Sequence, residues 1–376
     1  MRNLSRLCAE LATAAALAAA SVATHAHWPG QPEHQMAQLG DLKLESGEVI
    51  KNFRMSYVTH GKLNAARDNT VVYLHGFASN HHGLDHLIGP GRALDTERYF
   101  IVCPDALGAT QIDYEHTTSP TNSGLKMKFP PYNQRDMVYA TYRLLTEALG
   151  LQRVLAITGT SMGARHSVQF AVMYPNFMDT IIPVAGGATG THGAAKGRFR
   201  GPITPSTITA CSGWNNGEYD ANPKACATLG LTALVMHFYT PDWWEAYLDS
   251  PEAYTRWRNN IGEYLDVQDA RDLYFLSVAQ GRSSVADTPG FDGDVIKALA
   301  SIKARALYIY NPRDELYSAR DAEFDIKAIA NARGLVIDSN VGHFIFSNSL
   351  PQPTQLMGDG IRRFLDELAT QRLGSK

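Results

Sequence analysis

Short apolar runs alternate with helical stretches through the first half of the chain. The apolar runs occupy residues 71–74, 99–103, 154–158 and 180–184, and the clearest helical patterns cover residues 133–149 and 162–174. Continuous apolar strands that are separated by helices are typical of a parallel sheet with helices on both faces. Before them, residues 41–60 alternate polar and apolar positions around a Ser-Gly turn, which predicts an antiparallel hairpin. The pattern therefore predicts an α/β fold with a mostly parallel sheet.

The alternation of strands and helices stops near Gly186 and returns at residue 305. Between these points lie four of the five tryptophans, and residues 243–248 and 253–265 have helical patterns. A structureless loop of this length would be unusual in a compact domain, so we expect an inserted helical cap. After the cap come a strand at 305–310, a helix at 319–332, a strand at 334–338 and a last helix at 360–373. The expected divisions are a first core part at 27–187, the cap at 188–294 and a second core part at 295–376.

Charge and composition exclude two classes of protein. The 376 residues carry 34 Lys and Arg against 37 Asp and Glu, a net charge of −3, and 19% of them are charged. Nucleic-acid-binding proteins normally show a basic face, so we expect no nucleic-acid partner. After the N-terminus no apolar run approaches the roughly 18 residues that a membrane span needs. The composition is that of an ordinary folded globular chain.

The N-terminus has the pattern of an export signal. Arg2 and Arg6 precede an apolar stretch at 11–22, and Thr24-His25-Ala26 offers small residues for cleavage. We expect a signal peptide at 1–26, cleavage after Ala26 rather than Ala23, and a periplasmic or secreted protein. An Ala-rich helix that stays on the protein is the alternative, because Glu10 interrupts the edge of the apolar stretch.

Two of the four cysteines bracket a loop. Cys211 and Cys226 flank a Gly- and Asn-rich segment, whereas Cys8 lies in the leader and Cys103 in an apolar run. In an oxidising compartment Cys211 and Cys226 are expected to pair, and a loop of this size gains about 3 kcal/mol of stability in the chain-entropy model. Two free thiols are the alternative.

The pentapeptide Gly159-Thr160-Ser161-Met162-Gly163 has the G-x-S-x-G pattern. It follows an apolar strand and opens a helix, which is the strand–turn–helix context of a nucleophile elbow. The turn is so tight that small residues must flank the serine, and the start of the following helix favours negative charge. We therefore expect Ser161 to be a nucleophile above the carboxyl edge of the sheet.

An elbow of this kind needs an acid and a base later in the chain, in the order Ser, Asp or Glu, His. Asp314 follows the strand at 305–310, and His343 follows the strand at 334–338. His343 is expected to accept the proton of Ser161, and Asp314 to hold the imidazole tautomer and stabilise its cationic form. Glu315 is the rival acid, and Asp314 is preferred because Asp is the commoner acid in such sites.

The oxyanion hole is expected to consist of two backbone amides. One belongs to Met162, directly after the nucleophile, and the other to Phe77, which follows the strand at 71–74. These roles use the main chain, so the two side chains only shape the pocket.

Other polar clusters have simpler explanations. His81, His82 and His86 include a pair four residues apart, but Asp85 alone does not complete a zinc-type ligand set, so we expect no metal site and no cofactor. For Arg165 and His166 in the following helix, helix packing or solvent contact is preferred over contact with an anionic substrate.

The quoted motifs resemble the α/β-hydrolase superfamily and, within it, the homoserine O-acetyltransferase-like branch. The matching segments are RALDTERYFIVCPDALG at 92–108, FPPYNQRDMV at 129–138, GTSMG at 159–163 and RDELY at 313–317. The resemblance implies an α/β-hydrolase fold with an eight-stranded sheet and a helical lid after the sixth strand. It also supports Asp314 as the acid.

The sequence departs from that branch at several positions. The acetyltransferases carry GGSMGG at the elbow, whereas Thr160 and Ala164 stand here, and the segment after the sixth strand lacks their arginine-containing pattern. They also carry Asp after the catalytic His, where it binds the homoserine amino group, but this position is Phe344. An aromatic ring cannot accept a hydrogen bond from an ammonium group as a carboxylate does. Homoserine recognition is therefore not expected.

We expect a secreted or periplasmic serine hydrolase that cleaves a small carboxylic ester, or less readily a lactone or amide, through an acyl-enzyme on Ser161. The alternative is an O-acyltransferase of the homoserine acetyltransferase type with the same three residues. A third hypothesis is a binding protein without catalysis on a hydrolase scaffold, against which the complete set of Ser161, Asp314 and His343 argues. A homodimer is one possible assembly, and the sequence leaves the oligomeric state open.

Overall fold

The computed structural model describes residues 31–112, 115–188, 201–281, 283–348 and 350–374. The chain from Pro32 onward forms one compact unit. The expected signal peptide at 1–26 lies outside the described residues, as does part of the segment that opens the expected cap. None of the helices in the described ranges is both long and apolar enough to cross a membrane.

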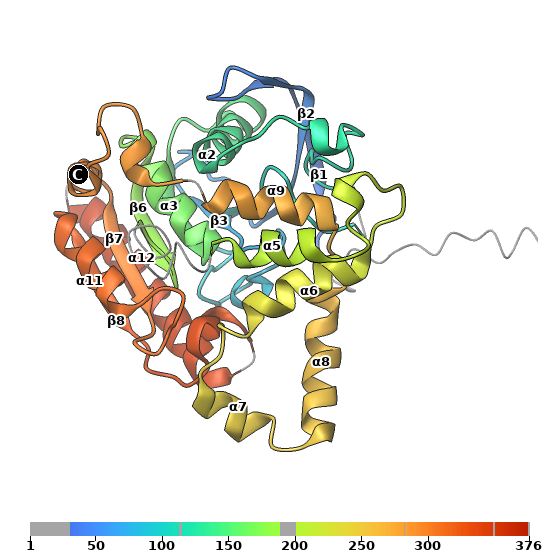
Figure 1. The fold of residues 1–376 in the computed structure, drawn as a ribbon. Helices are drawn as coiled ribbons and strands as arrows, with labels where there is room; N and C mark the ends of the chain where they lie inside the picture. The colour runs from blue at the N-terminus through green and yellow to red at the C-terminus, as the bar shows by residue number, and fades with distance from the viewer. Residues whose placement is uncertain (1–30, 113–114, 189–200, 282, 349, 375–376) are drawn as a thin grey trace, which may run out of the picture. The chain divides into compact units, whose positions relative to one another are not determined.

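A single sheet of eight strands organises this unit (Figure 1). The strands are β1(Gln35–Lys43), β2(Val49–His60), β3(Thr70–Leu74), β4(Phe100–Pro104), β5(Val154–Thr160), β6(Met178–Val184), β7(Arg305–Tyr310) and β8(Ala332–Val336). Their spatial order is β1-β2-β4-β3-β5-β6-β7-β8. The strands from β3 to β8 pair in parallel, whereas β2 runs antiparallel to both β1 and β4. The α/β-hydrolase fold expected from the motifs is thereby confirmed.

The predicted hairpin forms the antiparallel edge of the sheet. Leu42 pairs with Ile50 across it, and the turn closes where the Leu44 amide donates to the Glu48 carbonyl over 2.9 Å. The hairpin begins earlier than expected, at Gln35, because β1 continues to pair with β2 as far as Tyr57.

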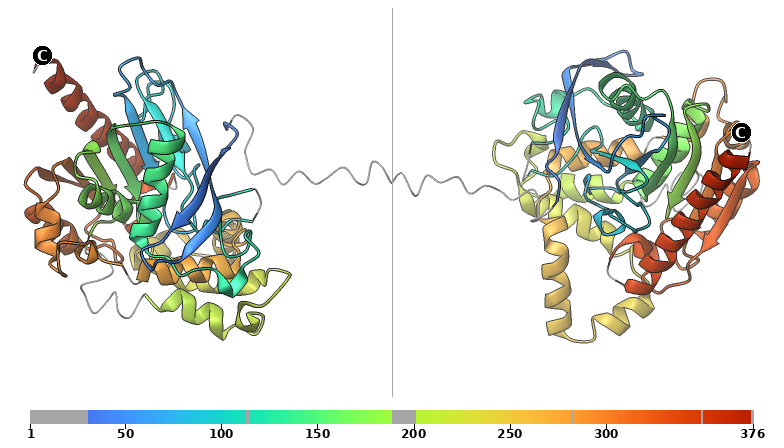
Figure 2. Two further views of the ribbon diagram at one scale, coloured as in Figure 1. Left: turned by 90° about the horizontal axis from the view of Figure 1, so that it is seen from above. Right: turned by 180° about the vertical axis from the view of Figure 1, so that it is seen from behind.

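Alternate residues of the strands face two separate cores, as the two-residue period of a strand requires. Val72 and Leu74 belong to the core that also contains residues of α2(Gln134–Arg143) and α3(Met162–Met173). Val71 and Tyr73 belong to the opposite core, which contains residues of α12(Pro351–Gly374). The view from behind in Figure 2 shows α12 lying across its face of the sheet. Burial on both faces explains why these strands are apolar throughout.

Several elements have different bounds from those predicted. The helix expected at 319–332 is α11(Ala319–Ala328), and the strand expected at 334–338 is β8, which begins at Ala332 and ends at Val336. The helix expected at 133–149 is α2 followed by one π-helical turn, Leu144–Ala148. The last helix begins at Pro351 rather than at residue 360, because a proline costs little in a first turn, where its missing N–H would have no helical partner. Gly360 then lies inside α12, where a Cβ atom would approach the Leu335 side chain to 2.2 Å. Close packing against β8 therefore explains a glycine that looked like a helix boundary.

The described residues between β6 and β7 are mostly helical. The longer helices from residue 201 to residue 281 are α5(Ile203–Ala210), α6(Lys224–Val235), α7(Pro241–Tyr247), α8(Pro251–Leu265) and α9(Ala270–Gly281). Two of them, α7 and α8, match the predicted patterns, and both begin with a capping hydroxyl, from Thr240 and Ser250, followed by proline. The helices α5, α6 and α9 were not predicted and lie together over the carboxyl edge of the sheet (Figure 1).

Smaller elements complete the described chain. They are α10(Val295–Ala300), α11(Ala319–Ala328) and the short helical turns η1(Asp85–Leu87), η2(Lys126–Lys128), η4(Asn215–Gly217), η5(Val285–Asp287) and η6(Gly342–Phe346).

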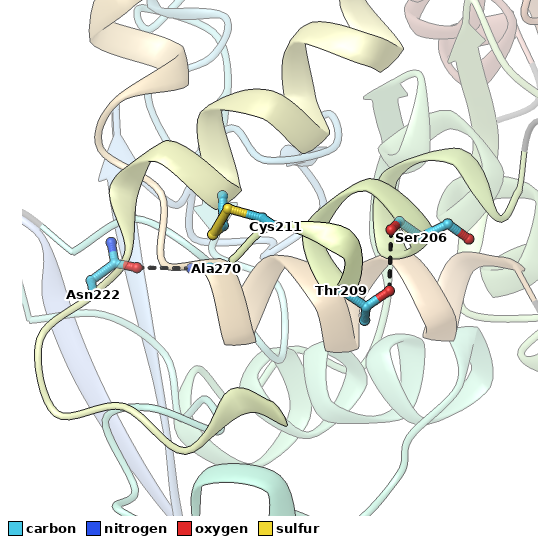
Figure 3. The surroundings of a disulfide bond; sticks show 6 residues. Ser206, Thr209, Cys211, Asn222 and Ala270 are labelled. Carbon is cyan, nitrogen blue, oxygen red and sulfur yellow. Dashed lines mark hydrogen bonds between the residues drawn. A yellow bond between two sulfur atoms is a disulfide. The ribbon is translucent and has the colours of Figure 1, made fainter. Parts of the chain in front are cut away.

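The disulfide joins the end of α5 to α6. Cys211 and Cys226 are bonded, with their Cα atoms 5.5 Å apart (Figure 3). Beside it the Asn222 side chain accepts a hydrogen bond of 3.1 Å from the Ala270 amide at the start of α9. The expected disulfide is present and joins α5 to α6, and the Asn222 hydrogen bond adds a contact to α9. Cys103 is a buried free thiol.

Candidate active site

Ser161 lies in a strained turn between β5 and α3. Its φ is +52°, in a region that residues other than glycine rarely adopt. A Cβ atom on Gly163 would lie 1.9 Å from the Leu74 carbonyl oxygen, and one on Gly159 would lie 2.4 Å from the Gly163 carbonyl. Both flanking positions therefore require glycine, for the steric reason that the pentapeptide indicated.

The structure brings Ser161, His343 and Asp314 together from three separate parts of the chain. His343 Nε2 lies 2.8 Å from Ser161 Oγ, and His343 Nδ1 lies 2.7 Å from Asp314 Oδ2. Asp314 and His343 are buried residues, with exposures of 3% and 2%. A carboxylate at Nδ1 favours the tautomer with its proton there, which leaves Nε2 as an acceptor for the serine hydroxyl.

The local backbone fixes Asp314 rather than Glu315 in this arrangement. Asp314 Oδ1 accepts hydrogen bonds from the amides of Leu316 and Tyr317, at 2.7 and 3.1 Å. Glu315 instead points toward His237, 3.9 Å away, with 44% of its side chain exposed. The position of the rival acid thus favours Asp314.

Asn311 links the two loops that carry Asp314 and His343. It is fully buried, and its Nδ2 donates to the carbonyls of Ser339 and Gly342, at 2.6 and 2.8 Å. Its Oδ1 accepts from the amides of Arg313 and Ser339. Asn311 was not predicted as part of the site, although its place between the end of β7 and Pro312 marked it as a turn residue.

The cap also holds the histidine loop. The His343 amide donates to the Phe238 carbonyl over 2.6 Å, and the two rings lie 5.2 Å apart. Gly342 has a φ of +65°, and a Cβ atom there would lie 2.4 Å from the Phe238 carbonyl oxygen. Glycine before His343 is therefore required both by its conformation and by the close approach of the cap.

The two expected oxyanion-hole residues lie beside the elbow. Met162 is the first residue of α3, and Phe77 follows β3 in a loop where a Cβ atom on Gly76 would lie 3.8 Å from the Ser161 Cβ. This loop is tied to the cap, since the Tyr264 hydroxyl donates to the Phe77 carbonyl over 2.8 Å. The Gln268 side chain donates to the Ala78 carbonyl over 3.0 Å.

A pocket of about 130 Å³ opens over Ser161. This volume is close to that of an engineered cavity that accepts benzene, so a small acyl group fits. Ser161, His343, Phe77 and Met162 line it, and Asp314 lies behind His343. The pocket is also lined by Arg165, Leu234, Phe238, Ser277 and Gln280.

Arg165 and His166 follow Ser161 on α3, and both are buried. Burial lowers the pKa of Arg165 to about 10, and burial followed by the charge of Arg165 lowers the pKa of His166 to about 3. His166 Nε2 lies 3.0 Å from Gln280 Nε2, which donates to it, so His166 is a neutral acceptor in the packing between α3 and α9. Helix packing, the preferred interpretation, therefore describes His166.

The histidines of the loop after β3 pair with carboxylates. His81 Nδ1 lies 2.9 Å from Asp105, and His82 Nδ1 lies 2.8 Å from Asp85. Within the described ranges, no three His, Cys, Asp or Glu side chains are arranged to hold a metal ion. No catalytic role is assigned to this cluster.

Phe344 occupies an aromatic cluster rather than the pocket over Ser161. Its ring lies 4.6 Å from that of Phe238, 5.2 Å from that of Tyr239 and 5.6 Å from that of Phe346. It lines a second cavity, between α7 and α8, together with Trp243. The residue directly after His343 therefore takes part in apolar packing.

Comparison with known proteins places this geometry in context. A family model described as alpha/beta hydrolase fold matches residues 69–198. A homoserine O-acetyltransferase of Symbiobacterium thermophilum is 28% identical over 371 residues, which cover 88% of this chain and 93% of that protein.

Solved structures share the fold over nearly the same span. An acetylester hydrolase from Corynebacterium glutamicum aligns with a TM-score of 0.80 and 23% identity, covering 89% of this chain and 96% of the other. A homoserine O-acetyltransferase from Bacillus anthracis aligns with a TM-score of 0.78 and 22% identity, covering 89% and 98%. At this level of identity the two structures show that the fold is shared. One is named as a hydrolase and the other as an acetyltransferase, so the names do not agree on one activity.

Proposed function

Because the chain belongs to the α/β-hydrolase superfamily and to its homoserine O-acetyltransferase-like branch, we propose that it transfers an acyl group through an ester on Ser161. The observation that carries this proposal is the pair of short contacts from His343, to Ser161 Oγ and to Asp314. Such a set makes a serine hydroxyl nucleophilic at neutral pH.

In the first half of the reaction Ser161 Oγ attacks the carbonyl carbon of an ester or thioester. His343 Nε2 takes the hydroxyl proton, and Asp314 stabilises the imidazolium that forms. The amides of Met162 and Phe77 donate to the oxyanion of the tetrahedral intermediate. When the intermediate collapses, His343 returns the proton to the leaving alcohol or thiol, and the acyl group stays on Ser161.

In the second half an acceptor hydroxyl attacks the acyl-enzyme, with His343 again removing the proton. The names of the curated relatives favour an organic hydroxyl as acceptor, which is O-acyl transfer, over the hydrolysis preferred from the sequence. The acceptor we propose is not a free amino acid such as homoserine. None of the residues that line the described pocket is a carboxylate able to bind an ammonium group, and Phe344 lies in the aromatic cluster.

Hydrolysis remains the second candidate, with water as acceptor. The same lining favours it, because a largely apolar pocket that lacks a carboxylate offers little to orient an amino-acid acceptor. Both reactions use one acyl-enzyme, and they differ only in the second half.

The acyl-enzyme is tested with a fluorophosphonate probe and p-nitrophenyl acetate. We expect one covalent adduct, located at Ser161 by peptide mass spectrometry, and loss of both labelling and turnover in Ser161→Ala. Ser206→Ala is the matched control, since Ser206 is an exposed serine of α5. Labelling or turnover that persists in Ser161→Ala overturns the proposal.

The acceptor is tested by partition of the acyl-enzyme. The enzyme is supplied with acetyl-CoA or p-nitrophenyl acetate, with homoserine, serine or simple alcohols present, and the acetate and acetyl ester formed are measured. Acetyl ester that exceeds acetate supports transfer. Acetate as the main product with every acceptor supports hydrolysis, and efficient acetylation of homoserine contradicts the exclusion of amino-acid acceptors.

We also propose that the protein is exported after cleavage behind Ala26. The signal-like pattern at 1–26 supports this, and so does the disulfide, because such bonds persist mainly in oxidising compartments. The protein recovered from a periplasmic or extracellular fraction is expected to begin at His27. An uncleaved chain found only inside the cell contradicts export.

A further inference from the structure

Arg165 is a buried cation that faces the pocket over Ser161. It lies one helical turn after Ser161, and its amide donates to the Ser161 carbonyl over 3.2 Å. Only 9% of the residue is exposed, yet Arg165 lines the same pocket as Ser161 and His343. A charge at this place is within reach of a substrate that occupies the pocket.

The guanidinium of Arg165 contacts only neutral oxygens. Nη1 donates to the carbonyl and side-chain oxygens of Gln280, at 3.3 and 3.2 Å, and Nη2 donates to the carbonyls of Gln280 and Ser283, at 3.3 and 3.2 Å. Charge-assisted hydrogen bonds are usually shorter, about 2.7–2.9 Å for a carboxylate partner. Among the ion pairs of the described residues, none includes Arg165.

A second buried arginine provides the contrast. The Arg271 guanidinium also binds neutral oxygens, but at 2.8–3.1 Å, and it lies 4.1 Å from the centre of the Tyr219 ring. Arg271 does not line the pocket over Ser161. Arg271 is thus held by shorter hydrogen bonds and an aromatic ring, whereas Arg165 is held by longer hydrogen bonds at the wall of a cavity.

The neighbours of Arg165 compensate its charge only in part. The carbonyl of Gln280 belongs to the C-terminal turn of α9, which carries the equivalent of roughly half a negative charge. The residues that line the described pocket include no Asp or Glu, and many of them are apolar. The uncompensated part of the Arg165 charge therefore acts across the pocket with little dielectric screening. Burial lowers the pKa of Arg165 to about 10, which still leaves it charged at neutral pH.

We propose that Arg165 binds a carboxylate carried by the substrate, so that the enzyme prefers acid-bearing esters over neutral esters of the same size. The incoming carboxylate replaces the amide oxygen of Gln280 on Nη1, exchanging a neutral acceptor at 3.2 Å for a charged one. Gln280 keeps its contact with His166 through Nε2. The proposal deepens the proposed function of the same site and rests on it for the kinetic test.

The kinetic test uses two matched pairs of esters, because the carboxylate can lie on either side of the scissile bond. The acyl-side pair is the p-nitrophenyl monoester of glutaric acid and p-nitrophenyl hexanoate. The alcohol-side pair is 3-acetoxypropanoate and butyl acetate. For one pair we expect the ratio of kcat/KM, charged over neutral, to fall at least tenfold in Arg165→Gln and to recover in part in Arg165→Lys.

The matched control is Arg153→Gln, which removes the same charge from a side chain that is 63% exposed. We expect this variant to keep the wild-type ratios. If Arg165 only packs α3 against α9, Arg165→Gln lowers stability and the activity on all four esters together, with unchanged ratios, and the proposal is overturned.

A binding measurement separates this proposal from the proposed function. Glutarate is titrated into Ser161→Ala, with and without Arg165→Gln, and binding is followed by calorimetry and by the shift of the thermal midpoint. We expect binding that is at least tenfold weaker with Arg165→Gln. If glutarate binding depends on Arg165 but the wild-type enzyme shows no esterase activity, only the proposed function is refuted. If the two variants bind glutarate with equal affinity, the role of Arg165 is refuted.

Discussion

The hydroxyl of Tyr264, on cap helix α8, donates a hydrogen bond of 2.8 Å to the backbone carbonyl of Phe77, in the loop that follows β3. The same loop carries the Phe77 amide, which is the proposed second oxyanion donor. Ala78, the next residue, has a φ of +55°, so the loop is strained and needs contacts that hold it. The cap therefore fixes the backbone of the proposed oxyanion hole as well as covering the pocket.

The first prediction concerns this contact. Tyr264→Phe removes one hydrogen bond, which is worth about 1 kcal/mol, so we expect kcat to fall about fivefold with little change in KM. Steady-state kinetics with p-nitrophenyl acetate measures the effect. Tyr254→Phe is the control, because Tyr254 lies on the same helix and is 52% exposed. Equal rates in the two variants would show that the contact does not position the donor.

The second prediction concerns Asn311. Asn311→Ala leaves buried carbonyls and amides of the loops around Asp314 and His343 without their partner, so we expect the free energy of unfolding to fall by about 2–4 kcal/mol. Urea denaturation measures this loss, and the rate of fluorophosphonate labelling is expected to fall as well.

Asn311→Asp serves as the isosteric comparison. It keeps the acceptor for the Arg313 amide but places a carboxylate oxygen against the carbonyls of Ser339 and Gly342, so we expect it to be no more stable than Asn311→Ala. Asn331→Ala, at an exposed position, is the control. Full stability in Asn311→Ala would contradict a linking role.

Sequence patterns predicted those parts of the site that local rules decide. Ser161 was recognisable because a strand, a tight turn flanked by glycines and a helix follow one another within a few residues. Asp314 and His343 were recognisable because parallel strands end at one edge of the sheet, so residues just past β7 and β8 meet there.

Non-local packing decides the parts that were missed. Asn311 and Tyr264 are ordinary turn and helix residues until the loops they bind are brought beside them by the fold. In α5, α6 and α9 the apolar residues are spread around the helix instead of lying on one face, so the helical period is weak in the sequence. Arg165 likewise resembled a packing residue, because only the fold shows which side of α3 faces the pocket.

The third prediction concerns the disulfide. Replacing Cys211 and Cys226 together by serine opens a loop with a sequence separation of 15, so we expect the free energy of unfolding to fall by about 3 kcal/mol. Denaturation of the wild type in dithiothreitol is expected to reproduce this loss, and dithiothreitol is expected to leave the double variant unchanged. A wild-type midpoint that does not respond to the reductant would contradict the stabilising role.

The last prediction concerns acid stability. Burial and then the charge of Arg165 lower the pKa of His166 to about 3, from its ordinary value of 6.5. Between these two values the unfolded chain binds a proton at His166 that the folded chain does not. The free energy of unfolding is therefore not reduced by His166 above pH 6.5, and it falls as the pH falls from 6.5 toward 3. Burial also lowers the pKa of His75 and of His116, so the effects reinforce one another.

We expect the free energy of unfolding to fall on acidification by up to about 1.4 kcal/mol per pH unit for each such histidine. Urea denaturation at several pH values between 4 and 7 measures how steeply the free energy of unfolding changes with pH. His166→Gln is expected to make this slope smaller by the contribution of one titrating histidine. Glutamine removes the titrating group but can still accept from Gln280. Ser206→Ala, at an exposed position of α5 that does not titrate, is the control, and its slope is expected to match the wild type. If His166→Gln also kept the wild-type slope, His166 would have to be protonated in the folded protein, and its contact with Gln280 Nε2 would need a different pair of donor and acceptor.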